Sequence, residues 1–397
     1  MTVERTPTLH CSILFLSSAL RDRDRFDLSS CRALRPESFY GMKKKILVIH
    51  QGALGDLVLI FPALMSLKHE EKASVALLCT NGLGKIAHEL NVVNEHFSLE
   101  RARFYCLFSE EMTPVVKEFI NDYDTVVLIS FSDVIERHIR QNHRGKVHRI
   151  SPRPPVEEET HVTLHLIRQL QRKRLLKNTC GFEPQKRVHS PSASGPPKAD
   201  RELQSLRSKP LSITSNMDGS LLRKERFVVI HPGAGSQKKR WPLKNFIQVA
   251  AAIRGMNLGE VVFIIGPAES DLAPFIKART KEGFRVDEVY DLSYVTALLR
   301  QARCFIGHDS GVTHLAAFMG TPTVAIFGPS SPKRWAPVGH AVKVLRGEAD
   351  CAPCFELGVV DCKDRQCLDG VSADMVLDAV RELVHLGGNR GCDGGFR

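Results

Sequence analysis

Residues 308–328 read HDSGVTHLAAFMGTPTVAIFG and pass through three kinds of local sequence. A polar Asp-Ser-Gly turn follows the apolar stretch CFIG and precedes a run of small residues typical of a helix. After Gly-Thr-Pro the sequence is apolar again, as in a buried strand. A strand, a helix and a second strand in this order are the unit from which parallel sheets are built.

The same alternation of strand and helix signals extends over most of the chain. Strands are predicted at KILVIH, ASVALLCT and TVVLIS in the first half, and at FVVIH, EVVFIIG, CFIGH and TVAIFG in the second half. This pattern predicts an α/β protein with two doubly wound, Rossmann-like domains that face each other across a cleft. Ligands of such sheets bind at the carboxyl ends of the strands.

Composition divides the 397 residues into five parts. We expect an N-terminal Rossmann-like domain at 43–183 and a C-terminal Rossmann-like domain at 225–386. The linker or insertion at 184–224 is rich in Ser, Pro and Lys and cannot bury enough apolar surface to become ordered. Residues 1–42 are expected to be a disordered extension or a start assigned in error, and 387–397 a flexible tail. No apolar run reaches the roughly 18 to 20 residues that a membrane-spanning helix needs.

The net charge of +11 is concentrated in one segment. Residues 137–189 contain 13 Lys and Arg against 4 Asp and Glu, a local balance of +9. Such a cluster favours an anionic partner, such as a phosphate-rich lipid or a membrane surface, and a solvated basic face is the alternative. Few aromatic residues interleave the charges and no nucleic-acid-binding module is recognisable, which argues against nucleic acid.

The loop at HDSGVTH has the features of an anion site. Asp309 or Ser310 is placed to cap the following helix, and Gly311 lets an anion approach the backbone. The backbone N–H groups of Gly311, Val312 and Thr313, at the helix start, would face that anion. The imidazole of His314 would be within reach of the same anion. The alternative is a capped turn with a packed histidine.

Two further glycine loops follow predicted strands. In HPGAGSQKKRWP, Gly233 and Gly235 open the backbone, and the cationic run that includes Lys239 suits a diphosphate. In QGALGD, Gly52 and Gly55 precede an aspartate, and their spacing departs from the dinucleotide-binding fingerprint. That aspartate, Asp56, can cap the helix that it begins, or accept a proton from an acceptor hydroxyl.

The cysteines suggest one further hypothesis. Eleven cysteines are too few for a disulfide scaffold in a chain of this length, and a cytoplasmic setting with reduced thiols is expected. Only one group has a spacing that merits a metal hypothesis, namely Cys351, Cys354, Cys362 and Cys367. Structural zinc is one interpretation and packed cysteines are the other.

Taken together, these motifs resemble glycosyltransferase family 9, the ADP-heptose:lipopolysaccharide heptosyltransferases of Gram-negative bacteria. The resemblance covers roughly residues 43–383, through KILVIHQGALGDLVLIFPAL, VVIHPGAGSQKKRWPLKNF, FIGHDSGVTHLAAFMGTPTVAIFGPSSPKRWAP and the cysteine-rich tail. It implies a GT-B fold and inverting transfer of a heptose from ADP-heptose to the inner core of lipopolysaccharide, with no cofactor or metal required. It also implies a lipid A-core acceptor and a cytoplasmic location peripheral to the inner membrane.

The resemblance assigns roles residue by residue. Asp56 matches the general base, and Lys239 resembles the lysine near the donor phosphates. The donor-sugar and diphosphate motif is matched by Asp309, Ser310, Gly311 and His314. The turn at Thr321 and Pro322 is similar to the nucleotide-side wall.

Several points stay open at this stage. The loop glycines Gly52 and Gly55 are expected on the acceptor side, and we hypothesise that the basic triplet Arg172, Lys173 and Arg174 contacts the anionic acceptor at the membrane. A different nucleotide sugar, or a non-catalytic nucleotide-sugar-binding protein of the cell envelope, are the alternative functions. The acceptor hydroxyl, the heptose step and the oligomeric state are not predicted.

Overall fold

The computed structural model describes residues 44–80, 82–109, 111–177, 227–358, 362 and 365–388. The predicted extension at 1–42 and the linker at 184–224 lie outside the described residues, as does the predicted tail apart from its first two residues, which end the last helix. Lys43–Arg397 form one compact unit. Within the described ranges, no helix is both long enough and apolar enough to span a bilayer.

The first sheet has five parallel strands in the order β3-β2-β1-β4-β5. They are β1 (Lys44–His50), β2 (Ala73–Cys79), β3 (Glu95–Ser98), β4 (Thr125–Ile129) and β5 (Lys146–Ile150). Alternate residues of β1 are buried on opposite faces: Ile46 and Val48 belong to one apolar cluster and Leu47 and Ile49 to another. Burial of both faces explains the continuous apolar sequence of this strand.

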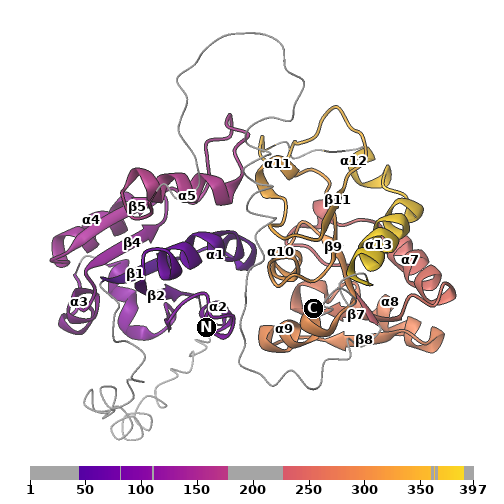
Figure 1. Ribbon diagram of the computed structural model, residues 1–397, viewed down its shortest axis with the longest axis horizontal. Coiled ribbons are helices and arrows are strands. Elements are labelled where there is room, and N and C mark those ends of the chain that lie inside the picture. The colour runs from indigo at the N-terminus through magenta and orange to yellow at the C-terminus, as the bar shows by residue number, and fades with distance from the viewer. Residues whose placement is uncertain are drawn as a thin grey trace, which may run out of the picture. The chain divides into compact units, whose positions relative to one another are not determined.

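Helices cover both faces of this sheet (Figure 1). One face carries α1 (Leu54–His69), α2 (Leu83–Glu89) and α5 (Val162–Arg172). The other carries the 3-10 helix η3 (Ala102–Leu107), α3 (Pro114–Asn121) and α4 (Asp133–Asn142).

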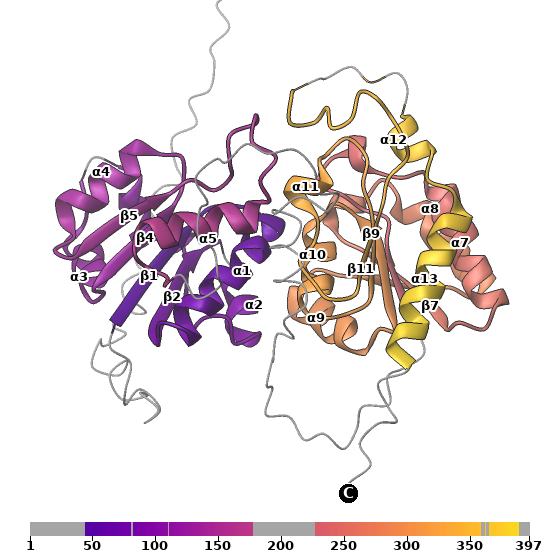
Figure 2. The same ribbon diagram turned by 45° about the horizontal axis from the view of Figure 1, so that its top comes forward.

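The second sheet has six parallel strands in the order β11-β10-β9-β6-β7-β8. They are β6 (Phe227–His231), β7 (Glu260–Ile265), β8 (Arg285–Glu288), β9 (Cys304–His308), β10 (Thr323–Ile326) and β11 (Val342–Leu345). One face packs against α7 (Leu243–Gly255), α8 (Ala273–Lys277), α12 (Gln366–Asp369) and α13 (Ala373–Gly388) (Figure 2). The other face packs against α9 (Leu292–Gln301) and α10 (Gly311–Phe318).

Short helices complete the second half of the chain. They are η4 (Gln237–Lys239), η5 (Pro267–Glu269), η6 (Ala278–Glu282) and α11 (Pro332–Trp335). The predicted α/β class with two doubly wound parallel sheets is confirmed. The residue boundaries proposed for the two domains stay predictions.

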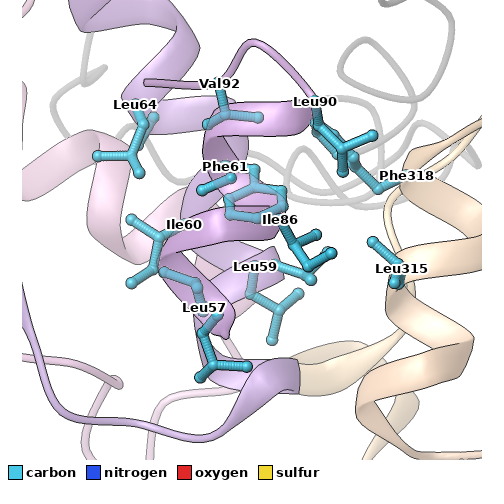
Figure 3. Packing of buried hydrophobic residues seen from close by; sticks show 14 of the residues in the cluster. Leu57, Leu59, Ile60, Phe61, Leu64, Ile86, Leu90, Val92, Leu315 and Phe318 are labelled. Carbon is cyan, nitrogen blue, oxygen red and sulfur yellow. The ribbon is translucent and has the colours of Figure 1, made fainter. Parts of the chain in front are cut away.

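The two sheets share one apolar cluster, in which α1 packs against α10. Figure 3 shows Leu315 and Phe318 of α10 facing Phe61 and Leu90. The rings of Phe61 and Phe318 meet edge to face with centroids 5.0 Å apart. Burying one such side chain contributes about 1.5 to 3 kcal/mol, so this contact is a substantial part of what holds the middle of α1 against the end of α10.

Candidate active site

The capping residue of α10 is Ser310. Its hydroxyl accepts the N–H of Thr313 at 3.5 Å and lies 3.0 Å from the Thr313 hydroxyl, which donates to the His308 carbonyl. The structure therefore selects Ser310 over Asp309 as the cap. It also corrects the expectation for Thr313, which is buried and uses its N–H inside the cap. Gly311 and Val312 remain at the start of the helix and line a cavity.

Asp309 is turned away from the cap and is buried among polar partners. Its Oδ2 lies 2.6 Å from Lys239 Nζ and accepts the Ser330 hydroxyl at 2.6 Å, while its Oδ1 lies 3.5 Å from His314 Nε2. Burial by itself would raise the pKa of this carboxyl. The His314 imidazole and the Lys239 ammonium outweigh that effect and hold the pKa of Asp309 below its usual range.

His308, at the end of β9, joins three loops and was not singled out from the sequence. Its Nε2 accepts the Trp241 backbone N–H at 2.6 Å, so its proton lies on Nδ1, which donates to the Gly233 carbonyl at 3.0 Å. Burial lowers the pKa of His308 to about 3. The neutral imidazole therefore holds the Lys239 loop against the glycine loop that follows β6.

Lowering the pH is expected to destabilise the protein through buried histidines. Between pH 6.5 and 4 the unfolded chain binds a proton at His308 that the folded chain does not, so each pH unit costs about 1.4 kcal/mol of unfolding free energy. His50, whose pKa burial lowers to about 4, acts in the same direction. Thermal melts from pH 7 to 4.5 should fall less steeply for His308→Gln, whose amide donates and accepts but does not titrate. Parallel curves would contradict this account.

The sequence also predicts that side chains around Gly266–Glu269 discriminate between donors, and of these Glu269, in η5, is a buried carboxylate. Its Oε2 accepts the Gly266 N–H at 2.8 Å and lies 3.6 Å from His231 Nε2. Although burial opposes ionisation, hydrogen bonding and charge from His231 hold the pKa of Glu269 below its ordinary value. A Cβ atom at Gly233 would lie 2.0 Å from Glu269 Oε1, whereas one at Gly235 meets no atom within 4 Å.

We therefore expect opposite results from two alanine substitutions in one loop. Gly233→Ala should displace Glu269 and lower the unfolding free energy by about 2 kcal/mol or more, because a buried carboxylate loses its contacts. Gly235→Ala should change it by less than about 0.5 kcal/mol. Urea unfolding of both variants measures the difference. Equal stabilities would show that Glu269 can move at no cost.

A cavity of about 330 Å³ lies at the carboxyl ends of the second sheet's strands. Its apolar wall consists of Ile264, Ile265, Val289, Leu292 and Val295. The opposite side carries polar groups and glycine loops, among them His231, Gly235, Glu269, Ser310 and Gly311, and the start of α1 closes it with Ala53, Leu54 and Gly55. An apolar slot with a few convergent polar groups suits a small organic ligand such as a nucleoside.

The turn at Thr321 and Pro322 does not form a wall of this cavity. Thr321 is buried and its hydroxyl donates to the Leu299 carbonyl at 2.8 Å. The Pro322 carbonyl accepts the Phe305 N–H at 2.8 Å. Both polar groups thus hold β9 and α9 in place, and the nucleotide-side role of this turn stays a prediction.

Asp56 lies in the first turn of α1 and caps it, accepting the Ala53 N–H at 3.2 Å. Gly52 is needed beside it, since a Cβ there would lie 2.7 Å from the Asp56 Cβ. A Cβ at Gly55 would lie 3.4 Å from His314 Cδ2 and 3.5 Å from the Gly311 Cα. The turn that carries Asp56 thus touches the start of α10, and the structure brings these two predicted motifs together.

The structure does not bring the basic triplet to this place. Arg172, Lys173 and Arg174 are exposed at the end of α5. The pKa of His148 is lowered first by burial and then by nearby positive charges, which come from Lys173, Lys44, Arg140 and Lys146. Lys44 and Lys146 begin β1 and β5, so the triplet lies at the amino ends of the strands. Because α5 runs antiparallel to the strands, it carries these charges away from the edge where Asp56 lies.

The four cysteines of this group lie near one another: after burial, the Cys351 and Cys362 thiols are further causes that raise the pKa of both Cys354 and Cys367. Cys354 and Cys367 are buried, while Cys351 and Cys362 are exposed. In the part of the chain that the structure describes, no three His, Cys, Asp or Glu side chains are arranged as metal ligands. Burial raises the pKa of the Cys354 and Cys367 thiols, as expected of packed cysteines.

Comparisons of sequence agree on one family. The model of "Glycosyltransferase family 9 (heptosyltransferase)" matches residues 175–361. Lipooligosaccharide heptosyltransferase 2 of Campylobacter jejuni is 27% identical over 170 residues, which are 40% of this chain and 51% of that protein. Lipopolysaccharide heptosyltransferase 3 of Escherichia coli is 32% identical over 169 residues, 41% of this chain and 47% of that protein. The matched part thus spans about half the length of these relatives.

Solved structures extend the likeness of fold to most of the chain. A glycosyl transferase family 9 protein of Veillonella parvula has a TM-score of 0.62 at 17% identity and covers 86% of this chain and 98% of its own. The ADP-heptose lps heptosyltransferase II of Escherichia coli has a TM-score of 0.60 at 16% identity, with 87% and 99% covered. These neighbours show that the fold is of the GT-B type. With the family match over residues 175–361, they show that the chain is similar to glycosyltransferase family 9 in sequence over nearly half of its length and in fold over most of it.

Proposed function

We propose that the protein is an inverting glycosyltransferase that moves a heptose from ADP-heptose to the inner core of lipopolysaccharide. The observation that carries the proposal is the contact between the Asp56 turn and the start of α10. The contact supports the proposal because Gly55, the residue before Asp56, lies against Gly311 and His314. His314 in turn lies 3.5 Å from Asp309, the partner of Lys239. A reaction between a hydroxyl and a phosphorylated sugar needs a carboxylate and an anion-binding helix start side by side.

The donor half of the proposal is supported by the cavity and the ion pair beside it. The apolar wall suits a nucleoside base, and the buried Glu269 and His231 offer polar partners for a sugar hydroxyl. The diphosphate would lie at the α10 start, where helix N–H groups and the dipole favour negative charge, with Lys239 as cation. These groups would stabilise the charge that grows on the departing diphosphate.

The acceptor half rests on Asp56. The acceptor hydroxyl would give its proton to this carboxylate while its oxygen bonds to the anomeric carbon of the heptose. The bond between that carbon and the diphosphate oxygen breaks on the opposite side, so configuration inverts and one base suffices. Gly52 lets the chain pass close to Asp56, since a Cβ at Gly52 would lie 2.7 Å from the Asp56 Cβ, whereas a Cβ at Gly55 would make ordinary contact with His314 and Gly311.

We also propose a cytoplasmic location, peripheral to the inner membrane, where a lipid A-core acceptor is reached. In this proposal the residues Arg172, Lys173 and Arg174 contribute to membrane association rather than to the sugar that reacts. Their place at the amino ends of the strands, away from Asp56, is the reason for the change.

Nucleotide release tests the function directly. Full-length protein is incubated with ADP-heptose, UDP-sugars or GDP-sugars, with and without a heptose-free lipopolysaccharide acceptor, and the released nucleoside diphosphate is measured. We expect ADP release that requires the acceptor. Release from another donor would keep the reaction and replace the substrate, while binding without turnover would favour a non-catalytic nucleotide-sugar-binding protein.

A further inference from the structure

The cysteine-rich segment, Cys351–Cys367, lies against the loop that carries Lys239. At one end the N–H groups of Cys354 and Phe355 both donate to the Pro329 carbonyl at 3.0 Å. At the other end the Arg365 guanidinium donates to the Arg240 carbonyl. The first contact is with the loop that follows β10 and the second is with the loop that carries Lys239, so both described ends of the segment lie near the proposed donor site.

Phe355 makes the direct contact with Lys239. The ammonium Nζ lies 4.6 Å from the centroid of the Phe355 ring, within the range of a cation–π interaction. The other partner of this ammonium is Asp309, at 2.6 Å. Lys239 is thus held between a carboxylate and an aromatic face, and only 18% of its side chain is exposed.

The neighbour of Phe355 fixes its position. Glu356 Oε1 accepts the Ser331 backbone N–H at 3.0 Å and the Trp335 indole N–H at 2.8 Å. The residue before Ser331 is Ser330, whose hydroxyl donates to Asp309. The same short stretch thus supports Phe355 on one side and Asp309 on the other, and a supported side chain is held closely to one geometry.

We propose that Phe355 is a positioning residue for the donor diphosphate and that Cys354, Phe355 and Glu356 form the outer wall of its site. The inference rests on the proposed function, because the ligand is taken to be a nucleoside diphosphate. A lysine side chain that is already ordered loses less rotamer entropy when it binds phosphate. The ring also keeps water from one side of the ammonium, which strengthens its attraction to the anion.

The test is calorimetric binding of ADP, UDP and GDP, and of adenosine, uridine and guanosine, to the full-length protein. For Phe355→Leu we expect Kd for the diphosphate that the wild type binds to rise about three- to tenfold. Kd for the matching nucleoside should not change, because the nucleoside lacks the phosphates that Lys239 meets. Phe355→Tyr, which keeps the ring, should bind as the wild type does.

The matched control is Phe275→Leu, the same substitution at an exposed phenylalanine of α8. It should leave every Kd unchanged. If Phe355→Leu raised Kd equally for the diphosphate and the nucleoside, the role of Phe355 would be merely structural and the inference would be overturned. Unchanged Kd values in Phe355→Leu would also overturn it, as would a Phe355→Tyr variant that binds as weakly as Phe355→Leu. A wild type that binds none of the three diphosphates would instead overturn the proposed function, and this inference with it.

Discussion

Replacing Asp56 with asparagine is expected to lower kcat for nucleotide release about 10³-fold and to leave Kd for the nucleoside diphosphate unchanged. The amide oxygen can still accept the Ala53 N–H, so α1 keeps its cap. The amide cannot take the proton of the acceptor hydroxyl. Steady-state release assays with saturating donor and acceptor, together with calorimetry of the diphosphate, measure the two quantities separately.

Asp133→Asn is the matched control for this prediction. Asp133 is also an acid in the first turn of a helix that follows a strand of the first sheet, and 71% of its side chain is exposed. Its replacement should change kcat by less than about twofold, in keeping with an exposed ion pair that contributes little. An Asp56→Asn variant that retained a tenth or more of the wild-type kcat would rule out a general-base role for Asp56.

The strands that could be read from the sequence are the interior strands of both sheets. β1, β2 and β4 in the first sheet, and β6, β7, β9 and β10 in the second, are buried on both faces and therefore apolar throughout. The edge strands β3, β5, β8 and β11 were not identified. Their sequences, EHFS, KVHRI, RVDE and VKVL, mix polar and apolar residues because a strand at an edge is only partly covered.

The candidate site divides in the same way between local and long-range signals. A cap at Asp309 or Ser310 and a helix start at Asp56 are local patterns and were predicted; the structure selects Ser310. The contacts of Glu269 and the role of His308 were not predicted, because their partners come from other loops that only the strand order brings near. Gly233 was interpreted as room for a phosphate, whereas the structure fills that room with Glu269.

The second prediction with a large effect concerns Lys239. We expect Lys239→Met to lower kcat/KM for the donor about 10²- to 10³-fold, because the charge that develops on the diphosphate loses its cation. Among the described lysines and arginines, Lys239 is the only one seen paired with Asp309. Lys238→Met removes the same charge from the next residue, which is exposed, and should change kcat/KM less than about threefold. Equal losses in the two variants would show that only the overall charge of the loop matters.

Stability separates the two roles that Lys239 can have. In Lys239→Met the buried Asp309 carboxylate loses its ammonium partner, and the unfolding free energy should fall by about 3 kcal/mol. Adding Asp309→Asn removes the unpaired charge, so the double variant should recover part of this stability in urea unfolding. Its kcat/KM should stay low, since no cation faces the diphosphate. If the double variant regained wild-type activity, the function of Lys239 would be to neutralise Asp309 rather than to bind the donor.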